Sequence, residues 1–140
     1  MYKSFTEMPV WRKALELSVK VFNLTVNLPR SEDYGLTSQI RKSSNSVSGN
    51  IAEGFGRKGN KDKCHFYIIA RGSATETQSH LLYGNEVGYF DPKIVKELFS
   101  EYKDLIFDLN RLMKGLNQII KAYHISMSTL NLNLNLNLFR

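Results

Sequence analysis

A long, unbroken apolar repeat in the C-terminal half of the chain constrains the fold most. Apolar residues recur there at alternating steps of three and four, at Val95, Leu98, Tyr102, Leu105, Leu109, Leu112, Leu116, Ile119 and Tyr123. This is the heptad spacing of helical bundles and coiled coils. A second row, with members seven residues apart, runs beside it: Phe99, Ile106, Met113 and Ile120. Asp91-Pro92 is a typical helix start. We therefore predict a helix over 92–123 whose face is wide enough for two neighbours in one bundle, or for the bundle and another subunit.

Three earlier segments also show helical periodicity, and we predict helices over about 7–28, 36–54 and 61–88. Thr6 and Asn60 are expected N-caps, and Pro29 is expected to end the first helix. The core face of the third helix is expected to hold Phe66, Ile69, Ala70, Ser73, Thr77, Leu81 and Gly84. The connectors are short, which favours antiparallel neighbours. The predicted fold is all-α, an antiparallel up-down four-helix bundle that forms a single domain over residues 1–123.

The segment from Leu36 to Arg57 is rich in small residues, with five serines and Gly49 among its helical positions. Serine and glycine are poor helix formers, so this segment should be helical only when other helices surround it. The predicted third helix is similarly slim, with Ala70, Gly72 and Gly84. Two slim helices are expected to pack closely against each other or against a partner subunit.

The last residues, 124–140, break the helical pattern. From Leu130 to Leu138 leucine and asparagine alternate strictly. A period of two is typical of a strand, but an all-helical domain offers no sheet, and asparagine is a poor strand former. We predict a disordered or loosely attached low-complexity tail; the alternative is an adventitious strand that pairs with another tail.

The basic residues are concentrated in one part of the sequence. The net charge is +6. Seven of the basic residues lie between Tyr34 and Thr75, where only Glu53 and Asp62 are acidic, whereas the rest of the chain is almost balanced. Such a local excess suggests an anionic partner. The alternative is that this charge serves solubility.

The loop Gly54–Lys63 is the best candidate for a binding site. The start of the following helix offers backbone N–H groups and a positive dipole end, and glycines allow close approach. We expect these residues to contact nucleic-acid phosphates: Arg41, Lys42, Arg57, Lys58, Lys61, Lys63 and Arg71. Phe55 and Phe66 could stack on bases; the simpler roles are core packing for Phe66 and packing over the helix end for Phe55. The alternative is a solvated loop without a ligand.

Groups that could support catalysis are sparse, and we expect no enzyme activity, cofactor or metal. Cys64 and His65 are adjacent on a helix and so point about 100° apart, which prevents a thiolate–imidazole pair. Glu76 and His80 share a helical face but lack the further ligands of a di-iron site. Glu53 is expected to pair with a nearby arginine. The single cysteine, the missing signal pattern and the missing membrane span together predict a cytoplasmic protein.

Several short motifs occur in the order found in one known family. They are Tyr34-Gly35-Leu36-Thr37, Gln39-Ile40-Arg41, Asn50-Ile51-Ala52-Glu53-Gly54 and Gly56-Arg57, with Trp11 and Ala14 before them and Ala70-Arg71-Gly72-Ser73 and Glu76 after them. Together they resemble the signature of the four-helix bundle proteins encoded in bacterial 23S rRNA intervening sequences. The resemblance covers about Phe5 to Tyr123; Ser43 and Ser44 stand where that family usually has alanine.

This resemblance implies an oligomer more than an activity, since the family has no established catalytic residues. The accessory proteins of diversity-generating retroelements are similar, and they form ring-like homopentamers that bind a reverse transcriptase and nucleic acid. Two functions follow as expectations. The first is a non-enzymatic, oligomeric RNA-binding protein connected with rRNA intervening sequences. The second is a protein-interaction scaffold, for example for a reverse transcriptase, with no direct nucleic-acid role.

Overall fold

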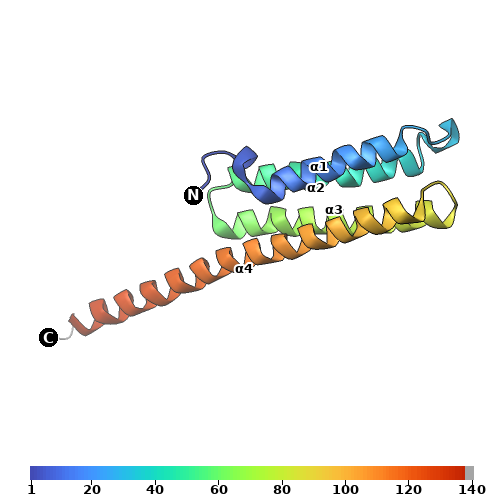
Figure 1. The fold of residues 1–140 in the computed structure, drawn as a ribbon. Helices are drawn as coiled ribbons and strands as arrows, with labels where there is room; N and C mark the ends of the chain where they lie inside the picture. Colours follow the sequence, from blue (N-terminus) through green and yellow to red (C-terminus); the bar gives the residue numbers. More distant parts are fainter. Residues whose placement is uncertain (138–140) are drawn as a thin grey trace.

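The chain folds into four α-helices and two short 3-10 turns, and the part of it that the structure describes contains no strand. A computed structural model describes the backbone of residues 1–137 and the side chains of residues 1–130. The elements are η1 (Phe5–Glu7), α1 (Pro9–Thr25), η2 (Arg30–Glu32), α2 (Leu36–Gly56), α3 (Asn60–Glu86) and α4 (Pro92–Asn137). Consecutive helices run in opposite directions and pack side by side, α1 on α2, α2 on α3 and α3 on α4 (Figure 1). The predicted all-α, up-down bundle is confirmed.

The helix boundaries are set by local sequence, and two of the expected caps are wrong. Asp91 caps α4 as predicted, because the Lys93 amide donates to Asp91 Oδ1 at 2.8 Å. Thr6 instead lies inside η1, and α1 begins at Pro9. Asn60 is already helical, with Gly59 as the residue before it. Asparagine was expected to end the loop, but the glycine takes the extended backbone of the cap position.

The core forms one continuous cluster along the bundle axis, to which every helix contributes. Tyr102, Leu105 and Leu109 of α4 are almost fully buried, as the heptad pattern predicts. Between α2 and α3 the contact is partly polar, because the Ser43 and Thr77 hydroxyls lie 2.9 Å apart. The close approach of these two slim helices is confirmed.

The core face of α3 differs from the prediction. Ile69 is 38% exposed and Phe66 is only half-buried, whereas Cys64 and Tyr67 are buried in the core. Ala70, Ser73, Thr77, Leu81 and Gly84 do face the core, as expected. The face is therefore rotated slightly at the start of α3, where a tyrosine rather than a phenylalanine packs against α2.

The C-terminal helix is much longer than predicted, because α4 continues past Tyr123 to Asn137. Its 46 residues exceed the 27 of α3, and its C-terminal part projects beyond the other helices (Figure 1). The boundary placed at Tyr123 rested on the end of the main apolar row, but the backbone stays helical within the Leu-Asn repeat as far as Asn137. Residues 138–140 lie outside the described residues. No helix within residues 1–137 is long and apolar enough to span a membrane.

Candidate nucleic-acid interface

Two of the predicted basic residues support the loop between α2 and α3 from within. Lys63 Nζ donates to the Phe55 carbonyl oxygen at 2.7 Å, which satisfies an acceptor at the end of α2. Arg57 forms an ion pair with Glu53 one turn earlier and lies 4.6 Å from the centre of the Phe66 ring. The expected pairing of Glu53 with an arginine is confirmed. These two cations are therefore partly engaged in holding the loop, and Phe66 is covered by Arg57.

Two further cations of the loop are exposed and could contact a ligand. Lys58 and Lys61 are exposed, and neither makes a hydrogen bond or ion pair with another of the described residues. Between them α3 begins at Asn60, with no side chain bonded to its first amides. The positive end of α3 thus opens between two exposed ammonium groups, which is a favourable place for an anion.

Arg41 and Lys42 do not join this cluster. They precede Arg57 by about four turns of α2, a distance of about 24 Å along the helix axis. Arg41 Nε donates to Thr25 Oγ1 at 2.7 Å, and its guanidinium lies 4.4 Å from the centre of the Phe22 ring. Arg41 therefore holds α2 against α1, while Lys42 is exposed on α2. Arg41 and Lys42 are near the loop in the sequence but far from it in the structure.

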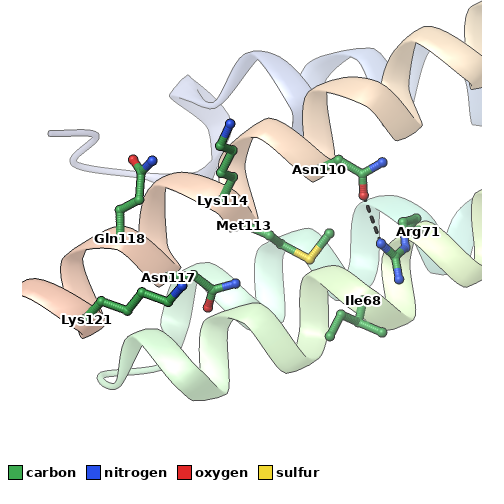
Figure 2. Close-up of a pocket in the computed structure, with 8 residues that line it drawn as sticks. All are labelled: Ile68, Arg71, Asn110, Met113, Lys114, Asn117, Gln118 and Lys121. Atoms are coloured by element: carbon green, nitrogen blue, oxygen red, sulfur yellow. Dashed lines mark hydrogen bonds between the residues drawn. The ribbon is translucent and has the colours of Figure 1, made fainter. Parts of the chain in front are cut away.

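Arg71 belongs to a groove between α3 and α4, which Figure 2 shows in close-up. Its guanidinium donates to Asn110 Oδ1 at 2.9 Å. The groove has a volume of about 470 Å³ and is lined by Ile68, Arg71, Asn110, Met113, Lys114, Asn117, Gln118 and Lys121. Three of these side chains are cationic, three are amides and none is acidic. Such a lining suits a phosphate backbone, since amides and cations both donate to phosphate oxygens.

The groove and the loop lie at the same end of the bundle. Cys64 Sγ approaches the Met113 carbonyl oxygen and Asn117 Oδ1, and α3 and α4 run antiparallel (Figure 1). One turn beyond these contacts, the two helices bring Lys121 to the level of the first turn of α3, where Lys61 lies. The three groove cations Arg71, Lys114 and Lys121 and the two loop lysines Lys58 and Lys61 thus lie toward the same end of the bundle, called here the basic end.

Lys114 and Lys121 were missed by the sequence analysis. Counting charges over residues 34–75 excluded α4, which returns to the same end of the bundle only through its antiparallel packing. A signal was available, because no acidic residue follows Asp108 although Arg111, Lys114 and Lys121 do. The basic C-terminal half of the fourth predicted helix could have been placed beside the start of the third, because the two helices were expected to run antiparallel.

The side chains that the sequence analysis considered for catalysis or metal binding, Cys64, Glu76 and His80, all lie on α3. Burial raises the pKa of the Cys64 thiol, which disfavours a nucleophilic thiolate. His80 Nε2 lies 3.5 Å from Glu76 Oε1, one turn away on α3. Within residues 1–137, no three His, Cys, Asp or Glu side chains are grouped so that they could hold a metal ion.

Comparison with known proteins identifies relatives of this fold and sequence. A solved structure of a protein of unknown function from the S23 ribosomal protein family of Bacteroides thetaiotaomicron is similar, with a TM-score of 0.68 and 22% sequence identity. The match covers 75% of this chain and 98% of that one. No curated protein matches the chain. The family model described as 23S rRNA-intervening sequence protein matches residues 6–111, and the chain therefore belongs to the 23S rRNA-intervening sequence protein family.

Proposed function

We propose that this protein is a non-enzymatic, oligomeric RNA-binding protein of the cytoplasm. The observation that carries the proposal is the basic end, where the α2–α3 loop and the α3–α4 groove together hold five cations at one end of the bundle. The two acidic residues nearest to it in the loop segment are Glu53, which Arg57 already neutralises, and Asp62. The family's connection with 23S rRNA intervening sequences supports RNA as the anion.

The form of the basic end suits a nucleic-acid backbone better than a small anion. Its cations are spread over the loop and along the groove instead of converging on one point, and the groove is open at the surface. Phosphates along a strand could be contacted in succession by Lys61, Lys121 and Lys114, with the amides of Asn117 and Gln118 between them. No base-specific contact is part of the proposal, since Phe66 is covered by Arg57.

An oligomer would strengthen such contacts by repeating them. We expect a homo-oligomer, a ring-like pentamer by the family resemblance, in which several basic ends act together. An exposed apolar stripe on α1 and its C-cap residue supports self-association: Leu15, Val19, Phe22 and Val26 are 41–55% exposed and follow one helical face. Beside it Arg41, Ser44 and Asn45 of α2 complete a shallow groove.

The test is a binding titration with matched charge reversals. Lys61→Glu/Lys121→Glu changes the basic end, and Lys93→Glu/Lys96→Glu makes the same charge change at the other end of the bundle. A fluorescent single-stranded RNA of about 20 nucleotides is titrated by anisotropy at about 50 and 200 mM salt. Phosphate contacts predict that log K falls with log salt, and that only the basic-end variant loses affinity and flattens this slope by about 0.7 per lost contact. Equal binding by both variants would remove the basis of the proposal.

A second candidate function is a protein-interaction scaffold or accessory factor, for example for a reverse transcriptase. The α1 stripe favours it, since an exposed apolar face also suits a different protein. Its basic end would then be incidental. A reverse-transcriptase gene beside the reading frame would favour the scaffold, and an rRNA gene that encloses the reading frame would favour the RNA-binding role.

A further inference from the structure

The C-terminal extension of α4, residues 117–137, begins beside the first turns of α3 and has little around it after Lys121. Side chains from Lys121 to Leu130 are all exposed. α4 is 19 residues longer than α3, or about 28 Å at 1.5 Å per residue. The extension also lies beyond residue 111, where the family match ends. It is a feature of this chain that the family's bundle does not explain.

The composition of the extension would not hold a helix alone. Serine, threonine, histidine and asparagine each cost about 0.5–0.7 kcal/mol relative to alanine in a helix, and the extension is rich in them. Isolated helices of this length are marginal in water even when they are rich in alanine. A helix here therefore requires a partner that covers one of its faces.

The apolar residues of the extension repeat in heptads that continue directly from the core of the bundle. One row is Met113, Ile120 and Met127, and the other is Leu116, Tyr123 and Leu130. Met113 is buried in the bundle, whereas Tyr123, Met127 and Leu130 are 64%, 41% and 53% exposed. The sequence continues the first row with Leu134. These two rows are the first and fourth heptad positions of a coiled coil.

The positions beside the rows decide which partner fits. Asn117, Ile119, His124 and Ser126 flank the exposed rows, and none carries a fixed charge. In coiled coils these flanking positions select partners by charge. Here they neither repel an identical helix nor attract a charged one, so an identical extension is an acceptable partner along residues 117–130.

We propose that the extension of one copy pairs with the extension of a second copy as a coiled coil along the Ile120, Tyr123, Met127 and Leu130 rows. The pairing buries the exposed rows and accounts for a helix that its own bundle leaves uncovered. It is a contact separate from the α1 stripe. It does not require the protein to bind RNA.

The test uses full-length chains with charges placed on or off the rows. Tyr123→Glu/Met127→Glu puts two carboxylates on the rows, and Ile125→Glu/Thr129→Glu puts the same two charges, four residues apart, on the outer face. Amide hydrogen exchange of residues 118–130 reports whether the extension is held as a helix. We expect slow exchange in the unmodified chain and the outer-face variant, and at least tenfold faster exchange in the row variant.

Mixing identifies the partner. Tyr123→Lys/Met127→Lys should also exchange fast alone, and an equimolar mixture with Tyr123→Glu/Met127→Glu should regain slow exchange, because opposite charges then face each other between copies. Recovery on mixing supports the pairing of two extensions. Fast exchange in the unmodified chain, equal exchange in the row and outer-face variants, or no recovery on mixing would each overturn it. Because none of these measurements involves RNA, their failure is distinct from a failure of the RNA-binding proposal.

Discussion

The contact between α2 and α3 at Gly54 offers a sharp test of the packing. A Cβ atom added at Gly54 would lie 2.6 Å from Tyr67 Cε1 and 3.2 Å from the Lys63 carbonyl oxygen. Tyr67 is only 2% exposed, so its ring has no open space to move into. Gly49, five residues earlier on α2, has nothing within 4 Å of the same added atom. Alanine therefore clashes at one glycine and fits at the other.

The expected free energies follow from two effects. Replacing a helical glycine by alanine stabilises a helix by about 0.5–1 kcal/mol, and both sites receive this gain. Overpacking a core site costs about 1–3 kcal/mol, and only Gly54→Ala incurs this cost. Gly49→Ala should therefore be more stable than the unmodified protein by about 0.5–1 kcal/mol. Gly54→Ala should be less stable than Gly49→Ala by the overpacking cost alone, about 1–3 kcal/mol.

Urea unfolding followed by circular dichroism, at one fixed protein concentration, measures both variants. The urea midpoint should be higher for Gly49→Ala than for the unmodified protein, and lower for Gly54→Ala than for Gly49→Ala. The slope of the unfolding free energy against urea concentration should not change. If the two variants shift the midpoint equally, then α2 and α3 are not in the close contact described, and the argument from Tyr67 fails.

Three other outcomes are expected. Leu109→Ala, at a fully buried site, should cost about 2–5 kcal/mol in urea unfolding, and a cost under about 1 kcal/mol would contradict its place in the core. At Glu101, partial burial disfavours the carboxylate, but hydrogen bonds from Lys13 and Lys20 outweigh it and lower its pKa below 4.5. Glu101→Gln should therefore cost about 0.5–1 kcal/mol near neutral pH, and this cost should disappear as the pH falls below 4.5 through the lowered pKa; a cost independent of pH would argue against the ion pair. Cys64, buried and with a raised thiol pKa, should react with a thiol reagent much more slowly in the folded protein than in urea, and equal rates would show that it is accessible.

The sequence predicts the buried faces well where periodicity is strong and poorly where it is weak. In α4 the heptad rows locate the core from Val95 to Leu109. In α3 two isoleucines follow Phe66 and Tyr67 directly, so apolar residues surround the start of the helix and no single face stands out. The choice between Phe66 and Tyr67 is made by Gly54 on α2, whose missing side chain leaves room for the Tyr67 ring.

The candidate site shows a different limit of the sequence. A cluster of cations within one stretch of sequence predicts a cluster in space only over about one or two helical turns. Lys58 and Lys61 satisfy this condition, whereas Arg41 is about 24 Å away along α2 and packs on Phe22. Lys114 and Lys121 come to the basic end from a distant part of the chain, because α4 runs antiparallel to α3. The predicted antiparallel arrangement of the helices would have to be used to place the charged residues in space, and not only the apolar ones.

The apolar rows of α4 are buried in the first part of the helix and exposed in the last part. As far as Met113 the rows are covered by the rest of the bundle, while Tyr123 and Leu130 continue the same repeat in the open. The repeat cannot distinguish these parts, because what separates them is the length of α3, which starts only at Asn60. Where a neighbour ends before the repeat does, the remaining rows are exposed unless a partner from outside the chain covers them. A heptad repeat that continues beyond the ends of the neighbouring helices therefore indicates that the chain assembles with another chain. The indication can be used once the lengths of the packed helices are known.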